Sequence, residues 1–172
     1  MAAYLKSHLT LEHDLKVTVI SLDDFYLSKA GRLTLSKNIH PLLKTPGVPG
    51  THKIDRALAV LQDLRGGHAP IKIPHFNKSQ DDVMPEDQWD IIEQPQDIII
   101  FEGWCLGAEP QDPKQLLPPT NELEFNEDKQ GIWRNYINEQ LQGKYRELFS
   151  MIDIWAMLTV SDFNTVFVWR LE

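Results

Sequence analysis

The sequence predicts an α/β domain built on a mainly parallel sheet. Three short apolar runs are typical of strands that are buried on both faces, and they cover residues 17–21 (VTVIS), 97–104 (DIIIFEGW) and 154–160 (IWAMLTV). Segments with apolar residues at helical spacing separate these runs. Because buried strands that alternate with helices indicate a parallel sheet covered by helices, we expect this architecture here.

Four segments are expected to be helical. The longest pattern spans residues 131–153, where apolar residues recur at helical spacing and Gly143 is a local weakness. Residues 54–67 place leucines on one face and end in two glycines, which is typical of a helix terminus. Weaker helical patterns cover residues 2–12 and 163–172.

The remaining segments are expected to form loops and one short edge strand. Irregular structure is expected over residues 27–50, 81–92 and 107–128. Within the first of these segments, the proline and glycine residues of 45–52 (TPGVPGTH) predict a shaped loop. Residues 71–76 suit an edge strand, because Pro74 cannot donate a hydrogen bond to a central ladder.

Composition narrows the class of protein. The chain has 172 residues, 42% of them hydrophobic and 24% charged, which suits one ordinary globular domain over residues 1–172. A net charge of -8 argues against a nucleic-acid partner held by a general electrostatic field. The single cysteine, Cys105, favours a reducing, cytoplasmic setting. No apolar run approaches the ~20 residues that cross a bilayer, so no membrane partner is expected.

Acidic residues stand at the ends of two predicted strands. Asp23 and Asp24 follow the first strand, and Glu102 lies near the end of the second. In parallel sheets, ligands bind at the carboxyl ends of the strands, so these acids are expected at one rim. One carboxylate could accept a hydroxyl proton while another holds Mg²⁺, as metal-assisted phosphoryl transfer requires. The residues alone leave a second interpretation open, in which both aspartates cap a turn or helix.

Several segments stand in an order that is typical of one group of enzymes: SLDDFY (21–26), PGVPGTH (46–52), DIIIFEGWCLG (97–107), the stretch from 121 to 149 and FVWRLE (167–172). Together they resemble the D-glycerate 3-kinase group of P-loop kinases, which are relatives of uridine kinase, phosphoribulokinase and pantothenate kinase. The resemblance implies a P-loop NTPase-like three-layer sandwich, ATP with Mg²⁺, and phosphorylation of a hydroxyl group on D-glycerate or a similar small hydroxy acid.

The same resemblance implies roles for individual residues. Asp23 matches the catalytic base, and Glu102 the Walker-B-like acid, so both are expected near Mg²⁺. The acceptor side is expected to include Tyr26, Thr51, His52 and Lys78, and a lid cation for the phosphates is expected at Arg170. Alternatives stay open for three of these residues: His52 as a loop hydrogen-bonding group, Lys78 as a solvated charge, and Arg170 as an ordinary helix charge.

The sequence also departs from the pattern of this family. The phosphate loop G-x-x-x-x-G-K-[ST] is absent, and residues 2–9 resemble the helix that normally follows it, so we expect the first strand and the loop to be missing before residue 1. Residues 46 and 83 are Pro and Val where the family usually has Arg, and residues 53 and 77 are Lys and Asn where it usually has Asp.

Three hypotheses of function follow. The first is an ATP-dependent kinase of a small hydroxy acid. The second is a non-catalytic remnant or binding module of the same fold, inactive because the phosphate loop is absent. The third, metal-dependent hydrolysis, lacks the expected support, because the six histidines show neither H-x-H nor H-E-x-x-H spacing. A sheet edge left open by a missing strand further predicts a homodimer.

Overall fold

Two parallel strands form the centre of the fold. In the computed structural model, which describes residues 1–159 and 162, strand β1 (Val17–Ser21) pairs with β6 (Ile98–Glu102). The register runs from Val17 opposite Ile98 to Ser21 opposite Glu102. Both strands predicted at these positions are confirmed. Their parallel register brings their carboxyl ends, and the acids that follow, to the same edge of the sheet.

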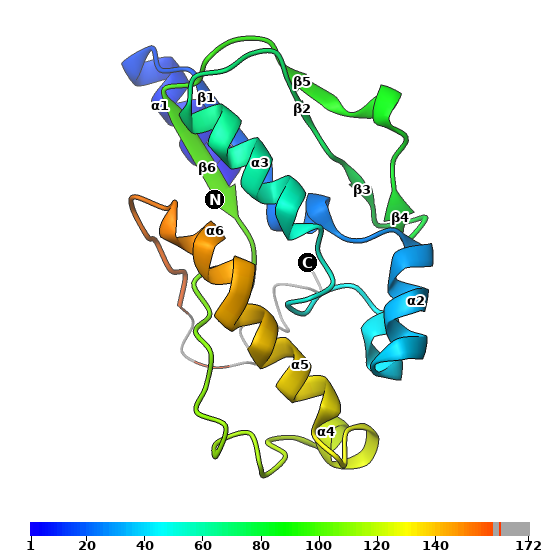
Figure 1. Ribbon diagram of the computed structural model, residues 1–172. Helices are drawn as coiled ribbons and strands as arrows, with labels where there is room; N and C mark the ends of the chain where they lie inside the picture. The colour runs from blue at the N-terminus through cyan, green and yellow to red at the C-terminus, as the bar shows by residue number, and fades with distance from the viewer. Residues whose placement is uncertain (160–161, 163–172) are drawn as a thin grey trace.

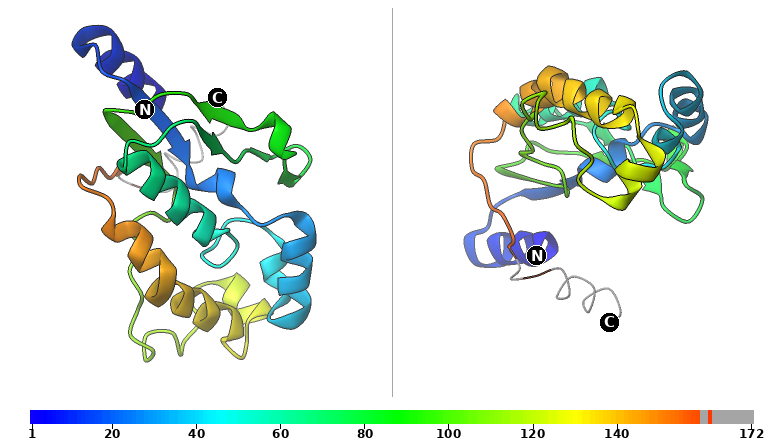
Figure 2. Two further views of the ribbon diagram at one scale, coloured as in Figure 1. Left: turned by 45° about the horizontal axis from the view of Figure 1, so that its top comes forward. Right: turned by 90° about the horizontal axis from the view of Figure 1, so that it is seen from below.

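Helices cover the two faces of this sheet (Figures 1 and 2). Helix α1 (Ala2–His13) lies on one face, whereas α3 (Ile54–Arg65), α5 (Ile132–Gln140) and α6 (Arg146–Ser150) lie on the other. The core fills the space beneath α3 and α6, and it includes Ile20, Leu22, Phe25, Leu58, Leu61, Leu64, Tyr145 and Leu148. The predicted three-layer α/β sandwich is therefore confirmed.

The two faces are packed unequally. Helix α1 buries none of its residues, although Tyr4, Leu5 and Leu11 are apolar. Strand β6 is only half-buried along Ile98–Phe101, whereas Val17, Thr18 and Ile20 of β1 are buried. The core therefore lies mainly between the sheet and α3 with α6.

Two short antiparallel pairs flank the α3 layer. Strand β2 (Ile71–Ile73) pairs with β5 (Asp90–Ile92), and β3 (Phe76–Asn77) pairs with β4 (Asp82–Val83). The edge strand predicted at 71–76 is thus confirmed for its first half, with Pro74 between two strands. The loop predicted over 81–92 is wrong, because this segment forms β4, the 3₁₀ turn η3 (Glu86–Gln88) and β5. Strands this short leave little periodicity in a sequence.

The irregular segment predicted over 27–50 is also wrong in part, because it contains helix α2 (Lys29–Asn38) and the 3₁₀ turn η2 (Pro41–Lys44). Ser28 caps α2 by accepting the N–H of Gly31. Arg32, with 0% of its surface exposed, is the residue that α2 buries. Its guanidinium donates to the carbonyls of Leu27 and Lys44. Because the residue that this helix buries is an arginine, no periodic pattern of buried apolar residues indicates the helix in the sequence.

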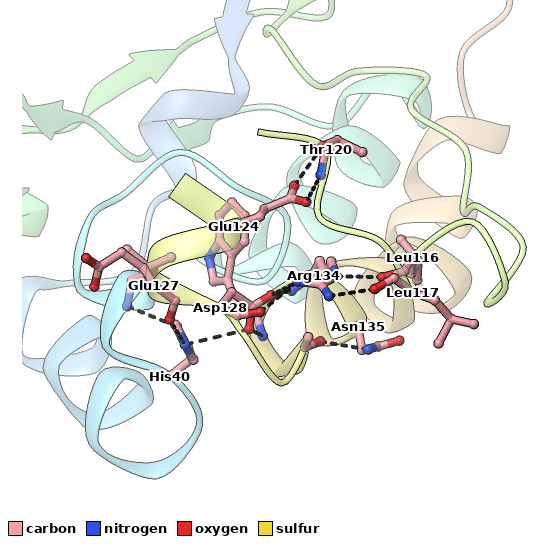
Figure 3. A network of polar contacts seen from close by, with 12 residues as sticks. His40, Leu116, Leu117, Thr120, Glu124, Glu127, Asp128, Arg134 and Asn135 are labelled. Atoms are coloured by element: carbon pink, nitrogen blue, oxygen red, sulfur yellow. Dashed lines mark hydrogen bonds and ion pairs between the residues drawn. The ribbon is translucent and has the colours of Figure 1, made fainter. Parts of the chain in front are cut away.

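The long segment at 107–128 ends in helix α4 (Glu122–Glu127), which was expected to be irregular. Asn121 caps this helix by accepting the N–H of Glu124. Arg134 of α5 fastens the preceding loop, because its guanidinium donates to the carbonyls of Leu116 (2.5 Å) and Leu117 (3.1 Å) (Figure 3). The loop is therefore held by polar contacts rather than by a regular apolar face.

The helix predicted over 131–153 is confirmed, with an interruption where Gly143 stands. A π-helical turn, η4 (Leu141–Tyr145), joins α5 to α6, and Gly143 has the non-helical angles φ -90° and ψ -128°. The change of helical period at this turn directs Tyr145 into the core, where it is 1% exposed.

The strand predicted at 154–160 is wrong for the residues that are described. Residues 154–159 form no strand, and Ile154, Trp155, Met157 and Leu158 are exposed. An apolar run forms a strand only where a neighbouring strand accepts its hydrogen bonds. None of the described strands pairs with residues 154–159. The helix expected over 163–172, together with Arg170, lies outside the described residues. Across the described residues, no helix is both long and apolar enough to span a bilayer.

Candidate active site

The turn after β1 places two carboxylates at the edge of the sheet. The 3₁₀ turn η1 (Leu22–Phe25) begins after Ser21, whose hydroxyl accepts the N–H of Asp23 at 3.3 Å. Ser21 is thus the residue that caps the turn. The side chains of Asp23 and Asp24 instead contact residues brought together by the fold, so the capping interpretation of the pair is not supported.

Asp23 accepts hydrogen bonds on both carboxylate oxygens. The Tyr26 hydroxyl donates to Oδ1 at 2.8 Å, and the Lys78 ammonium donates to Oδ2 at 2.9 Å. Burial, and next to it the hydrogen bond to Asp23, raises the pKa of Tyr26 above its usual range, so the phenol keeps its proton and remains a donor. The hydrogen bond to Asp23 likewise raises the pKa of Lys78. Three residues that the sequence singled out therefore meet at one carboxylate.

Asp24 has a different set of partners. Its Oδ1 accepts the backbone N–H of Phe76 at 3.1 Å and lies 3.1 Å from Nδ1 of His75. Burial raises the pKa of the Asp24 carboxyl. These contacts join η1 to β3, so Asp24 holds the hairpin that carries Lys78.

Glu102 ends β6, directly opposite Ser21 in the register. Its side chain is exposed, and its charge contributes to the raised pKa of Lys78 after the larger effects of Asp23. No group of three or more metal-ligating side chains occurs in the described part of the chain. Asp23 and Glu102 supply carboxylate oxygens, which are the type of ligand that Mg²⁺ prefers.

The loop over 45–52 carries a hydrogen-bond chain that ends at His52. The backbone N–H of Gly50 donates to the Tyr145 hydroxyl at 2.8 Å, and that hydroxyl lies 2.6 Å from Nδ1 of His52. The Tyr145 hydroxyl can donate its hydrogen to Nδ1 while its oxygen accepts from Gly50. Burial lowers the pKa of His52 to about 4, so the imidazole is neutral, and a hydrogen bond donated to Nδ1 would place the ring proton on Nε2.

Nε2 of His52 is buried and has no hydrogen-bond partner in the described structure. The imidazole stacks on the Tyr26 ring, with centroids 4.5 Å apart and 22° between the planes. The fold therefore holds an unpaired donor beside the tyrosine that contacts Asp23. An acceptor oxygen of a ligand would satisfy it.

Thr51 and Gly50 shape the same loop. The Thr51 hydroxyl donates to the carbonyl of Val48 at 2.7 Å and accepts the N–H of Gly47 at 3.2 Å, and the residue is 0% exposed. Gly50 has φ +96°, and a Cβ there would stand 2.4 Å from the Tyr136 ring. Only glycine fits this position without displacing Tyr136.

Two cavities border these residues. The larger, of about 610 Å³, lies between the start of α3 and η4 and is lined by His52, Lys144 and Tyr145 among others. The smaller, of about 190 Å³, is lined by Asp24 and Tyr26 on the η1 side. The structure thus brings Asp23, Tyr26, His52, Lys78 and Glu102 to one end of the sheet.

Other residues of the site were not predicted from the sequence. Tyr145 occupies an apolar position of the helical pattern, so nothing in that pattern indicated that its hydroxyl would orient His52. Trp104 is 67% exposed, and its indole N–H donates to the carbonyl of Gly47 at 3.0 Å. Contacts of this kind depend on which loops meet in space.

Similar proteins of known name were found by sequence. The chain is 32% identical over 181 aligned residues to a Schizosaccharomyces pombe protein named uncharacterized kinase mug58; the match covers all of this chain and 64% of that protein. It is 30% identical over 166 residues to the chloroplastic D-glycerate 3-kinase of Arabidopsis thaliana, covering 91% of this chain and 34% of the relative. The chain thus spans from a third to about two thirds of these relatives. No family model matches it.

A solved structure agrees with the sequence comparison. The D-glycerate 3-kinase of Cryptococcus neoformans var. grubii superposes with a TM-score of 0.75 at 27% identity, and the match covers 98% of this chain and 62% of that one. The strands and helices are therefore arranged on a known scaffold. In sequence and in fold the chain is thus similar to the kinases that include the D-glycerate 3-kinases.

Proposed function

We propose that the protein is an ATP-dependent kinase that phosphorylates a hydroxyl group of a small hydroxy acid, with D-glycerate as the first candidate. The observation that carries this proposal is the Asp23 carboxylate, which follows a parallel strand and is held between the Tyr26 hydroxyl and the Lys78 ammonium. Two of the related proteins bear the name D-glycerate 3-kinase. Ligands of parallel α/β sheets bind at this end of the strands.

Asp23 is the proposed general base. It accepts the proton of the acceptor hydroxyl while that oxygen forms its bond to the transferred phosphorus, and the bond to the leaving ADP oxygen breaks. Tyr26 keeps one Asp23 oxygen in place. Lys78 is exposed, so its ammonium can leave Asp23 and contact the anionic acceptor or the transferred group.

His52 and Thr51 have supporting roles in this proposal. Nε2–H of His52 is the donor that contacts an acceptor oxygen, and the chain from Gly50 through Tyr145 keeps this tautomer. Thr51 holds the loop that positions His52. Because the His52 imidazole is neutral, it can donate a hydrogen bond to the substrate without adding a charge to the site.

ATP supplies the phosphoryl group, and Mg²⁺ neutralises charge on its phosphates when both are bound. Asp23 and Glu102 are the residues proposed to hold Mg²⁺ or its waters. Arg170, outside the described residues, keeps the lid role that the resemblance implies. No G-x-x-x-x-G-K-[ST] loop occurs in the 172 residues.

The alternative function is a non-catalytic module that binds the acceptor alone. Calorimetry of the full-length protein with Mg·ATP separates the two functions. The kinase proposal predicts saturable, Mg²⁺-dependent nucleotide binding, whereas the module predicts heat of dilution only.

Turnover tests the proposal itself. ADP release from the full-length protein should depend on an added hydroxy acid, with D-glycerate, L-glycerate, pantothenate, glycerol and uridine as the panel. Release stimulated by a hydroxy acid and not by glycerol or uridine is expected. Equal stimulation by a neutral alcohol, or none by any compound, would contradict the proposed substrate class.

Two further properties belong to the proposal. A reducing compartment such as the cytoplasm suits Cys105, because this thiol is free and buried, and burial raises its pKa to about 11. A homodimer remains a prediction from the half-buried strand β6. Light scattering of the full-length protein checks it, with twice the protomer mass as the expected result.

A further inference from the structure

A small cavity beside the Asp23 site contains two cations without acidic partners. The cavity, of about 190 Å³, is lined by Asp24, Tyr26, Lys53, Arg56 and Trp89 among others. Within the described residues, neither Lys53 nor Arg56 forms an ion pair. A cavity of this volume suits a ligand smaller than a typical drug-sized molecule.

The Arg56 guanidinium is held in place but only partly paired. Its Nη2 donates to the carbonyl of Lys72 at 3.2 Å, and its central carbon lies 5.5 Å from the centroid of the Trp89 ring. The indole is itself anchored by a hydrogen bond to the carbonyl of Met84 at 2.8 Å. Nε of Arg56 is buried and has no partner in the described structure. A guanidinium with free donors matches a carboxylate, which can accept two hydrogen bonds at once.

Lys53 stands at the start of α3, and its backbone N–H donates to the carbonyl of Phe25 at 2.7 Å. This bond fastens the lysine to the turn that carries both aspartates. The side chain is exposed and can reach a ligand in the cavity. Lys53 is the N-cap residue of α3 and Arg56 follows three positions later, so their side chains neighbour each other and a single anionic group can contact both.

The acids that line the cavity do not neutralise this pair of cations. Asp24 is already engaged by His75 and by the N–H of Phe76. Glu86, on η3, is exposed and forms no ion pair with Lys53 or Arg56. Both cations therefore keep donor groups that a bound anion can engage.

The position of the cavity relates it to the reaction. Tyr26 forms part of its wall, and the hydroxyl of the same residue contacts Asp23 at 2.8 Å. We propose that Lys53 and Arg56 bind the carboxylate of the acceptor, so that its hydroxyl extends past Tyr26 toward Asp23. Selection of a hydroxy acid over a neutral polyol then depends on these two cations. This inference rests on the proposed function for the identity of the acceptor.

Binding of D-glycerate and glycerol to the full-length protein tests the inference without turnover. The two probes share a three-carbon chain, but glycerol lacks the carboxylate. The Trp89 indole N–H signal in ¹H–¹⁵N spectra, assigned with Trp89→Phe, is the reporter. D-glycerate should shift this signal saturably, and glycerol should not. An unshifted signal with D-glycerate, or equal shifts with both probes, would overturn the inference.

Variants identify the groups responsible. Arg56→Gln and Lys53→Gln should each weaken D-glycerate binding roughly tenfold or more. Lys72→Gln is the matched control, because it removes an equal charge from the exposed side chain of the neighbouring strand β2 and leaves the carbonyl that Arg56 contacts. If Arg56→Gln fails to fold, the exposed Lys53 variant still decides the question. Unchanged affinity in the folded variants contradicts the inference.

Kinetics separate a failure of this inference from a failure of the proposed function. Arg56→Gln should raise the KM for D-glycerate roughly tenfold while kcat changes little, because the contact is present in both ground and transition states. Phosphorylation of D-glycerate with an unchanged KM in both variants would leave the function standing and remove the carboxylate site. Cation-dependent D-glycerate binding without any phosphoryl transfer would leave the site standing and remove the function.

Discussion

Two aspartates in this molecule form ion pairs in opposite surroundings. Asp128, at the end of α4, has a side chain that is 1% exposed, and it accepts the backbone N–H groups of Trp133 and Arg134 as well as the Arg134 guanidinium (Figure 3). Nε2 of His40 lies 3.7 Å from Oδ1 of Asp128. Asp23 has a side chain that is 24% exposed, and its cationic partner Lys78 is 75% exposed.

The difference separates a carboxylate that holds the fold from one that is available for chemistry. Asp128 is held by backbone groups and by an arginine that also binds three carbonyl groups, so no partner can leave without unpairing a buried group. Asp23 has two side-chain partners: Tyr26, from a turn, and Lys78, from a hairpin. The Lys78 ammonium can leave Asp23 and contact solvent or substrate instead. Solvent access and movable partners thus indicate the reactive site better than the presence of an ion pair.

The largest expected effect tests this contrast through stability. Asp128→Ala should lower the free energy of unfolding by about 3–5 kcal/mol, because it leaves buried cationic and N–H groups unpaired. Asp23→Ala should cost about 1 kcal/mol or less. Urea denaturation of the full-length protein measures both losses of stability. Asp153→Ala is the control, because it removes an exposed ion pair with Arg65. Equal losses for Asp128→Ala and Asp23→Ala would break the comparison.

A smaller effect is expected from pH. The pKa of His52 is lowered to about 4 by burial, so between pH 6.5 and 4 the unfolded chain binds a proton that the folded chain does not. The stabilisation is complete above pH 6.5 and is lost as pH falls, by about 2 kcal/mol between pH 7.5 and pH 5. Denaturation at the two pH values should show this loss in the wild type and a smaller one in His52→Gln.

His8→Gln is the control for that measurement. It removes an exposed imidazole from α1 and leaves His52 in place, so it should keep the wild-type pH dependence. If His52→Gln and the wild type lose stability in parallel, burial of a neutral His52 is not the cause.

The smallest stability effect is expected at Lys78. Because its ion pair with Asp23 is exposed, Lys78→Gln should change the free energy of unfolding by less than about 1 kcal/mol. The same change should lower kcat/KM roughly tenfold or more if the ammonium contacts the acceptor or transferred group. Lys37→Gln, on the exposed side of α2, should affect neither quantity. A large stability loss with unchanged kcat/KM would assign Lys78 to the fold instead.

The contrast between regions also explains what the sequence could predict. Strands β1 and β6 and helix α3 follow from apolar runs and leucine spacing, since each packs apolar residues against the core. The parallel register of β1 and β6 places Asp23 at the same edge of the sheet as Glu102. Helix α2 escaped prediction because the residue it buries is Arg32, and 154–159 was overpredicted because an apolar run carries no information about its partner strand.

The finer parts of the site depend on tertiary neighbours. The Tyr145 hydroxyl orients His52 across 93 residues of sequence, and Arg56 meets Trp89 from a different element. No local sequence pattern predicts either contact, because these residue types also occur in helices and loops where they make no such contact. The sequence therefore suggested candidate residues one by one, whereas the contacts made by Tyr145 and by Arg56 could not be predicted from it.

Single-turnover phosphoryl transfer in Asp23→Asn and Asp24→Asn tests the central claim most directly. With ATP, Mg²⁺ and D-glycerate bound to the full-length protein, Asp23→Asn should slow product formation by about 100-fold or more, since it removes the general base. Asp24→Asn should slow it by less than about tenfold, because its partners His75 and Phe76 act only through the hairpin. A fast Asp23→Asn enzyme, or a slower Asp24→Asn than Asp23→Asn, would contradict the role of Asp23.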